Sequence, residues 1–171
     1  MFATRRATIS DAQVIGQLLV RSAKFAYADI ASPEYLAALD PEARAAEYER
    51  LLPVQHGLRY GVFLALDNNV ELGFAEIELS QVETAGPVGV LQRMFFVPES
   101  LGRGLGPLLH DTIVEEFTRW GCAEAGLTYV RGNERARSFY RKQGWAETGE
   151  IRPFDDHGRE LYDIVMRRLI P

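Results

Sequence analysis

The feature that most constrains this chain is a run of alternating glycines between a strand-like segment and a helix-like segment. Residues 101–106 read LGRGLG, after an apolar stretch at 88–97 and before an amphipathic one at 107–120. Glycines lack the Cβ atoms that keep a ligand from the backbone, so successive amides can turn toward an anion. The positive end of the helix adds to that attraction. This order of strand, glycine run and helix predicts a phosphate-binding turn made by Leu101, Gly102, Arg103, Gly104, Leu105 and Gly106.

Two familiar phosphate loops do not fit this glycine run. A Walker loop ends in Gly-Lys followed by Ser or Thr, which the run lacks. A dinucleotide-binding fingerprint has G-x-G-x-x-G spacing early in a βαβ unit, whereas the spacing here is G-x-G-x-G. Taken alone, the run is also compatible with a flexible strand-to-helix connection that binds nothing.

The period of the apolar residues changes along the chain and indicates helices on both sides of a hairpin meander. Ser10 with Gln13 is typical of a capping box that opens a helix, and Pro33 and Pro41 each follow a capping residue at a helix start. Further helices are expected at 107–120 and 133–143, and strands at 3–8, 60–66, 70–79, 88–97, 124–130, 145–151 and 160–168. A polar loop is expected at 81–87. This order predicts one α/β (α+β) domain over residues 1–171, with a mixed sheet between helices.

Composition argues against several classes of protein. No apolar run approaches the roughly 18 residues of a membrane span, and none follows the basic N-terminus, so neither a membrane protein nor a signal peptide is expected. A net charge of −5 disfavours a nucleic-acid partner. Cys122 is the only cysteine, which excludes an internal disulfide and fits the cytoplasm. The three histidines have no spacing typical of a ligand set, so no metal is expected.

A second group of residues, at 131–145, follows the glycine run. Asn133 is a good helix N-cap, and Phe139 and Tyr140 share one side of the helix that it begins, so the phenol can point into a cleft. Arg137 and Arg141 lie one turn apart on another face and are candidates to meet a phosphate. Taken alone, this segment favours Tyr140 as a core aromatic and the arginines as a solvated face.

Together, the two groups closely resemble the GNAT superfamily of N-acetyltransferases. The resemblance lies in the glycine run and in the pattern N-x-x-A-x-x-F-Y-x-K-x-G-W at 133–145, and the order of elements extends it to the whole chain. It implies a mixed, mostly antiparallel sheet whose middle strands splay apart to admit acetyl-CoA, with helices on both faces. The implied reaction is direct attack of a primary amine on the thioester of bound acetyl-CoA.

The resemblance also implies roles for individual residues. The glycine run would hold the coenzyme A pyrophosphate, and Leu101, which stands where the family usually has Arg or Gln, keeps its backbone amide. Asn133 would contact the cofactor, and Tyr140 would bind it and protonate the departing thiolate. The pantetheine arm would follow the backbone of Phe95, Phe96 and Val97.

The general base is not evident from the sequence. Several relatives carry a Glu on the strand before the loop, at a position that falls near Val90, with only Gln92 close by. Deprotonation is therefore expected to run through ordered water to Glu76 or Glu78. Cys122 is disfavoured as an acylated nucleophile because it follows a helix end and has no paired histidine in its sequence context.

The acceptor is expected to be a small amine that enters between the first helices and the last hairpin. Two alternatives stay open, namely an N-acetyltransferase of proteins or peptides and a non-catalytic acyl-CoA-binding module. The sequence leaves the acyl chain preference and a homodimer undecided. Candidate lining residues are Phe25, Tyr27, Tyr35, Glu76, Glu78, Asp155 and Asp156.

Overall fold

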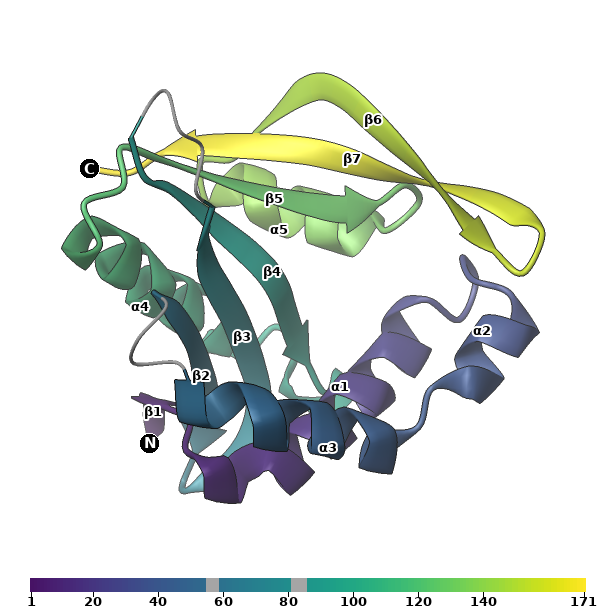
Figure 1. Cartoon of the computed structure of the whole chain (residues 1–171), viewed down its shortest axis with the longest axis horizontal. Helices are drawn as coiled ribbons and strands as arrows, with labels where there is room; N and C mark the ends of the chain where they lie inside the picture. The colour runs from purple at the N-terminus through teal and green to yellow at the C-terminus, as the bar shows by residue number, and fades with distance from the viewer. Residues whose placement is uncertain (55–58, 81–85) are drawn as a thin grey trace.

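The protein is described by a computed structural model that covers residues 1–54, 59–80 and 86–171 (Figure 1). The described residues form one sheet of seven strands in the order β1-β2-β3-β4-β5-β7-β6. Only β4 and β5 run parallel to each other, and the other neighbours are antiparallel. The strands are β1 (Phe2–Arg6), β2 (Tyr60–Asp67), β3 (Val70–Ser80), β4 (Val88–Phe96), β5 (Glu124–Val130), β6 (Ala146–Asp156) and β7 (Arg159–Leu169).

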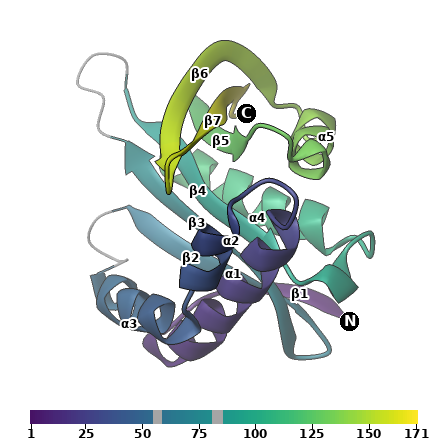
Figure 2. The same ribbon diagram turned by 90° about the vertical axis from the view of Figure 1, so that its right-hand side faces the viewer.

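Helices cover both faces of this sheet, as Figure 2 shows from the side. One face carries α1 and α3, since Tyr48 of α3 reaches Glu76 of β3. The opposite face carries α4, whose Thr112 bonds to Thr4 of β1. The helices are α1 (Ala12–Ala26), α2 (Pro33–Ala38), α3 (Pro41–Leu51), α4 (Leu105–Arg119) and α5 (Glu134–Lys142). The α/β (α+β) class and the mostly antiparallel sheet are therefore confirmed.

The middle of the sheet opens between β4 and β5. These two strands pair only where Val88–Leu91 meets Glu124–Leu127, and their later residues are paired to β3 and β7 instead. Strand β4 also has an extra residue, Gln92, between the pairs Glu76↔Arg93 and Ile77↔Leu91. Because such a β-bulge bends its strand and raises the local twist, it turns β4 away from β5. The two ribbons diverge beyond it (Figure 1).

The expected start of α1 is wrong. The structure places a 3-10 turn at Ile9–Asp11 before the helix, and the cap is formed by Thr8 and Asp11 instead of Ser10 and Gln13. The Thr8 amide donates to the Asp11 carboxylate over 2.7 Å, and Arg5 holds the same carboxylate at 2.7 and 2.8 Å. A carboxylate fixed by a guanidinium is a stronger capping partner than a neutral amide.

The other boundaries differ from expectation by small amounts. Helix α4 begins at Leu105, two residues before Pro107, because Gly104 takes a left-handed N-cap conformation with a φ of 97°. Strand β6 continues to Asp156 instead of ending near Ile151. The expected loop at 81–87 lies largely outside the described residues. None of the helices in the described ranges is long and apolar enough to cross a membrane.

Candidate active site

A cleft of about 620 Å³ occupies the space where β4 and β5 separate. Residues 91–96 of β4 form one wall and residues 128–130 of β5 the other. The end of α1, the glycine run and α5 complete it with Ser22, Phe25, Ala26, Tyr27, Ser100, Leu101, Gly102, Gly104, Gly106, Pro107, Asn133, Arg135, Ala136, Phe139 and Tyr140, and Asp163 is contributed by β7. Of the residues expected to contact the cofactor, the cleft brings together those from β4, the glycine run and α5, namely Phe95, Phe96, Leu101, Gly102, Gly104, Gly106, Asn133 and Tyr140.

The glycine run forms an open cradle at one end of this cleft. Gly102 and Gly104 have positive φ angles of 75° and 97°, a region that L-residues with side chains rarely adopt. A Cβ atom built on Gly102 would meet nothing within 4 Å, so the backbone there faces open space. Gly104 is also the N-cap of α4, which directs the first free amides of that helix toward the cradle. This geometry suits an anion.

Two residues of the run point elsewhere. The Arg103 guanidinium forms an ion pair with Asp67 and lies 5.7 Å from the ring centre of Phe2. Leu105 is fully buried against the core. Neither side chain lines the cleft, and the Arg103 amide donates to the Ser100 carbonyl at 3.4 Å.

The strand expected to hold the pantetheine arm is placed as the sequence indicates. Phe95 and Phe96 line the cleft. Val97 does not, since its side chain is buried and its amide donates to the Leu72 carbonyl at 3.0 Å. The edge of β4 that faces the cleft has no strand partner beyond Leu91 among the described residues, so its peptide groups are accessible to a ligand.

Tyr140 is enclosed by aromatic rings and faces the cleft. Its ring centre lies 5.4 Å from that of Phe139 and 6.2 Å from that of Trp145, and only 8% of the residue is exposed. Burial raises the pKa of the Tyr140 phenol, and the neighbouring Tyr27 raises it further. Within the described residues the hydroxyl has no hydrogen-bond partner, so a neutral O–H is available to a ligand.

Helix α5 presents an arginine other than the expected one. Asn133 caps the helix, with its side chain accepting from the Ala136 amide at 3.1 Å, and lines the cleft. Arg137 does not line it, because its Nε donates to Glu147 over 2.8 Å. Arg135, which sequence reasoning missed, does line it, 4.8 Å from the ring centre of Phe25.

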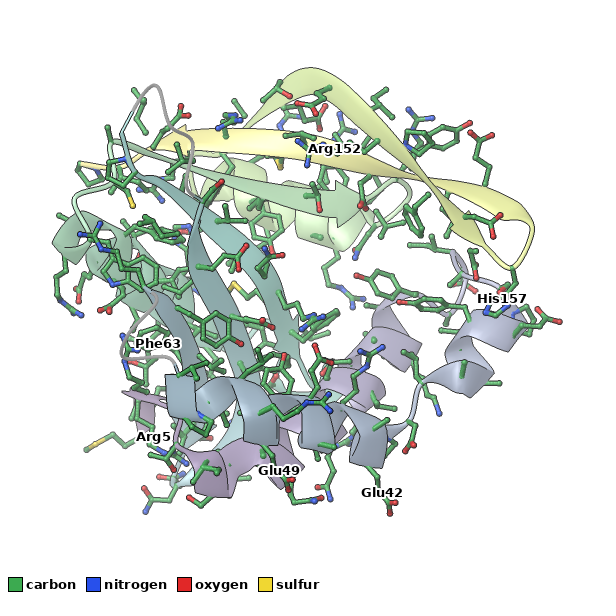
Figure 3. The ribbon with its side chains drawn as sticks, viewed as in Figure 1. Arg5, Glu42, Glu49, Phe63, Arg152 and His157 are labelled. Atoms are coloured by element: carbon green, nitrogen blue, oxygen red, sulfur yellow. The ribbon has the colours of Figure 1, made fainter. Side chains whose placement is uncertain are left out.

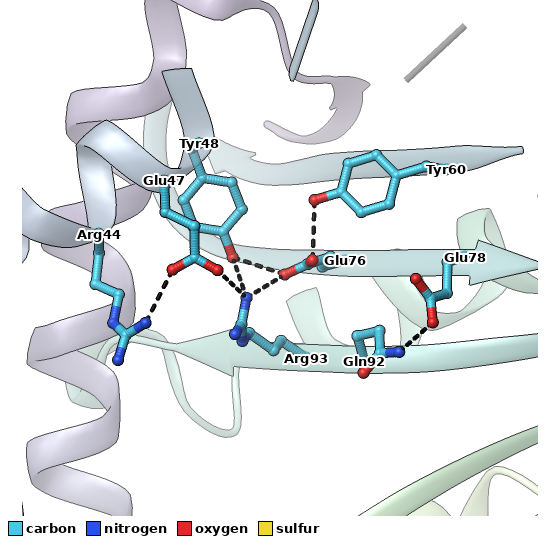
Figure 4. A network of polar contacts seen from close by, with 8 residues as sticks. All are labelled: Arg44, Glu47, Tyr48, Tyr60, Glu76, Glu78, Gln92 and Arg93. Atoms are coloured by element: carbon cyan, nitrogen blue, oxygen red, sulfur yellow. Dashed lines mark hydrogen bonds and ion pairs between the residues drawn. The ribbon is translucent and has the colours of Figure 1, made fainter. Parts of the chain in front are cut away.

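The two carboxylates expected to act as base lie on β3, beside Arg93 and Gln92 of β4 (Figure 4). Glu76 is buried and accepts hydrogen bonds from Tyr48 at 2.8 Å, Tyr60 at 2.9 Å and Arg93 at 2.7 Å. Glu78 accepts from the side-chain amide of Gln92. Neither glutamate lines the cleft, whereas their partners Arg93 and Gln92 do.

The residues expected around the acceptor fall into two groups. Phe25 and Tyr27 line the cleft, and Tyr35 lines a smaller cavity next to it. Asp155 and Asp156 line neither.

The two hairpin aspartates have structural partners. Asp155 accepts the Gly158 amide at 3.1 Å within the turn of the hairpin. Asp156 is buried and accepts from the Ser32 amide at 2.6 Å and its hydroxyl at 2.8 Å, which ties the β6–β7 hairpin to the start of α2. Figure 3 places His157 at the tip of this hairpin, beside α2.

Asp163 of β7 is the acidic residue that sequence reasoning missed. It lines both the cleft and the smaller cavity. A charged residue inside the otherwise apolar stretch 161–166, which reads LYDIVM, was the signal that could have found it.

The fold and the cleft define a transferase of the acyl-CoA type, and comparison with known proteins gives the family. The family model described as the acetyltransferase (GNAT) family matches residues 25–145, most of the chain. The protein therefore belongs to this family, and the resemblance inferred from its motifs is confirmed.

Solved structures with the same fold include several acetyltransferases. The PaiA N-acetyltransferase from Thermoplasma acidophilum, in complex with coenzyme A, is 22% identical with a TM-score of 0.77, and 99% of each chain is covered. The yncA protein from Salmonella typhimurium, with its cofactor acetyl-CoA, is 20% identical with a TM-score of 0.73 over 99% of this chain and 94% of that one. The ribosomal-protein-S18-alanine N-acetyltransferase from Escherichia coli is 22% identical with a TM-score of 0.70, at 99% and 94% coverage.

Residues 1–54, 59–80 and 86–171 hold no group of three or more His, Cys, Asp or Glu side chains that could bind a metal ion.

Proposed function

We propose that this protein is an acetyl-CoA-dependent N-acetyltransferase that transfers an acetyl group to a small primary amine. The observation that carries this proposal is the separation of β4 from β5 directly beside the glycine cradle. A cleft with an anion site at one end and an unpaired strand edge along its length suits a long donor with a phosphate head. Two of the structural neighbours were solved with coenzyme A or acetyl-CoA, which supports the same donor here.

The donor would lie along the cleft from the cradle to the bulge. Its pyrophosphate would accept hydrogen bonds from the amides of residues 102–106, at the start of α4. Asn133 and Arg135 would flank it from α5, and the pantetheine amides would pair with the free edge of β4 at Phe95 and Phe96. The thioester would then fall near Gln92, where a bulge leaves peptide groups unpaired to polarise the carbonyl.

In the proposed reaction the amine nitrogen attacks the thioester carbonyl, and the carbon–sulfur bond breaks. An alkyl ammonium has a pKa near ~10.4, so it must lose a proton before it can attack. Tyr140 would donate its phenolic proton to the departing thiolate and recover one from the new amide nitrogen. The raised pKa of this phenol keeps it protonated until the thiolate forms.

Glu76 and Glu78 stay predictions for the base. Since neither lines the cleft, each would require a chain of ordered water, and Glu76 already accepts three hydrogen bonds. A small acceptor is favoured over a peptide because Asp156 and Ser32 tie the β6–β7 hairpin to α2 across the acceptor side. The donor and the free, buried Cys122 fit a cytoplasmic enzyme.

Thiol release from acetyl-CoA, screened over amines, amino acids, aminoglycoside antibiotics and peptides, tests the proposal. We expect release with at least one small primary amine and no release with its N-acetylated form. Tight binding of coenzyme A without turnover on any acceptor would instead identify an acyl-CoA-binding module. Turnover confined to peptides would move the acceptor class to proteins.

A further inference from the structure

A second cavity, of about 240 Å³, adjoins the cleft on the side away from the glycine cradle. The two spaces share three lining residues, Tyr27, Val130 and Asp163, which therefore stand at their junction. The remaining walls are apolar or aromatic and consist of Ile30, Ala31, Tyr35, Phe154 and Leu161. A group at the junction can reach both an acceptor in the small cavity and a donor in the cleft.

Asp163 is the only acidic residue that lines either space within the described ranges. No hydrogen bond or ion pair to its carboxylate is formed by any described residue, although the carboxylate is half-buried. Its cross-strand partner Arg152 (Figure 3) donates to Glu150 at 2.8 Å instead. Partly buried carboxylates without partners are uncommon because they lose hydration and gain nothing in return. Such a group is suited to receive a cation.

The other titratable groups near Asp163 leave this position open to a ligand. Arg152 lies opposite on β6, and its charge lowers the pKa of Asp163 less than burial raises it. Tyr27 lines the cleft from the end of α1, and burial raises the pKa of its phenol, with smaller contributions from Tyr35 and Asp163. Tyr35 shares the small cavity, and Arg93 belongs to the cleft wall and to the ion pair with Glu76.

We propose that Asp163 binds the ammonium group of the acceptor and takes its proton, and that the small cavity selects primary amines with a single charge and an apolar or aromatic body. This inference rests on the proposed function and deepens it. The apolar walls would bury the body of such an amine, whereas a second ammonium would meet no counter-charge there.

The acceptor nitrogen loses two protons in the proposed reaction. The ammonium N–H bond breaks and its proton passes to a carboxylate oxygen of Asp163, which later releases it to solvent. The nitrogen lone pair forms the new bond to the acetyl carbon, and the electron pair of the carbon–sulfur bond leaves with sulfur. The second nitrogen proton replaces the one that Tyr140 gives to the thiolate. The sum is ammonium plus acetyl-CoA giving amide, coenzyme A thiol and one proton.

The test measures binding to the protein loaded with coenzyme A, so that no turnover occurs. Calorimetry at pH 7 compares 2-phenylethylamine, which is cationic, with 2-phenylethanol, its neutral analogue. The variants are Asp163→Asn, which keeps the side-chain volume, and Glu160→Gln, which removes an exposed charge from the same strand outside both cavities. We expect the wild type and Glu160→Gln to bind the amine at least about tenfold more tightly than the alcohol, as a charge-assisted hydrogen bond provides.

In Asp163→Asn this preference should fall below about twofold, with the affinity for the alcohol unchanged and binding of coenzyme A retained as the check on folding. If that variant does not fold, Asp163→Ser replaces it. A preference for the amine that survives in the variant overturns the inference. So does a wild type that binds coenzyme A but neither probe, or one that binds the diamine putrescine as tightly as 2-phenylethylamine. None of these results contradicts the proposed function, because coenzyme A is still bound. In this experiment, only a wild type that does not bind coenzyme A contradicts it.

Discussion

Strand β4 borders two regions that treat polar groups in opposite ways. On its β3 side the sheet is closed, and the carboxylate of Glu76 is buried with three donors. On its β5 side the sheet is open, and the hydroxyl of Tyr140 and the carboxylate of Asp163 have no hydrogen-bond partner within the described residues. Buried polar groups are normally satisfied, so the closed side is expected to contribute stability and the open side to bind a ligand.

The same contrast holds for charge. On the closed side, Arg93 pairs with Glu76, and Arg5 with Asp11, each across at most 2.8 Å. Removing one member of such a pair leaves the other uncompensated, which costs more than the pair itself contributes. On the open side, the carboxylate of Asp163 forms no ion pair with a described residue, so its removal leaves no described cation without a partner. Mutations on the closed side should therefore lower the free energy of unfolding, whereas mutations on the open side should change catalysis or ligand binding.

The largest effect is expected for Glu76→Ala on the closed side. The substitution removes the acceptor of the Tyr48 and Tyr60 hydroxyls and leaves Arg93 with its longer ion pair to Glu47 at 3.4 Å. We expect a loss of about 3 kcal/mol in the free energy of unfolding, measured by urea denaturation. Glu78→Ala is the matched control, since among the described residues Glu78 accepts only from Gln92, and should lose less than about 1 kcal/mol. Equal losses of stability in the two variants would show that the three hydrogen bonds to Glu76 contribute no more than the single one to Glu78.

Tyr140→Phe on the open side should show the reverse pattern. It deletes a hydroxyl that bonds to no described residue, so the free energy of unfolding should change by less than about 0.5 kcal/mol. Because a positioned acid is lost, kcat should fall at least about tenfold, or ~1.4 kcal/mol of barrier, with the Kd of coenzyme A unchanged. Tyr162→Phe, outside the cleft, is the control for a lost phenol. An unchanged kcat, under conditions where chemistry limits turnover, would make Tyr140 a packing residue.

Asp11 provides a pH test of the closed side. The hydrogen bond from Arg5 lowers the pKa of Asp11 to about 2, against an ordinary value of 3.8. A lowered pKa means that the charged form is stabilised by folding, so the contribution is complete above pH 4 and is lost as the pH falls toward 2. Arg5 is 40% exposed, so screening reduces the contribution to about 1 kcal/mol. Asp11→Asn should be less stable by this amount at pH 6, and the difference should shrink by pH 2.5. A difference that does not depend on pH would show that the carboxylate charge is not its source.

The smallest change in the free energy of unfolding is expected for Asp163→Asn. Unlike the other variants, this one should be more stable than the wild type. Burial raises the pKa of Asp163, so folding disfavours its charged form and stability falls as the pH rises through the ordinary range of an aspartate. Removing the charge should therefore stabilise the protein at pH 7, by a few tenths of a kcal/mol after screening. The gain should vanish below the ordinary pKa, and Glu160→Gln should show no comparable gain. Destabilisation at pH 7 would place Asp163 among the structural carboxylates.

Local sequence signals predicted the elements that we propose hold the donor. The glycine run, the cap at Asn133 and the bounds of β5 follow from neighbours along the chain, and the structure has them where they were expected. The direction of each side chain was harder to predict. Arg135 and Arg137 are two residues apart on α5. Which of them faces the cleft depends on Glu147 of strand β6, which binds Arg137.

The acidic residues show the same limit more clearly. Glu76 was expected to act as a base through ordered water, but its partners Tyr48 and Tyr60, which come from distant parts of the chain, already occupy its carboxylate. Asp155 and Asp156 lie at a polar hairpin end, where the sequence alone allowed a role in acceptor binding. In the structure, Asp156 instead accepts hydrogen bonds from Ser32. Only the tertiary contacts distinguish a carboxylate with donors from one without.

The binding of coenzyme A to the glycine cradle is the central claim, and one thermal-shift series tests it most directly. At about 100 times its Kd, coenzyme A should stabilise the wild type by roughly 2.7 kcal/mol, or roughly 5–10 °C in Tm. Gly104→Asp places a side chain and a negative charge in the cradle, and Gly149→Asp makes the same change on β6, at a similar φ of 86° and equally open. Both variants carry the same backbone strain, but only Gly104→Asp should lose the shift. A full coenzyme A shift in Gly104→Asp would contradict the account.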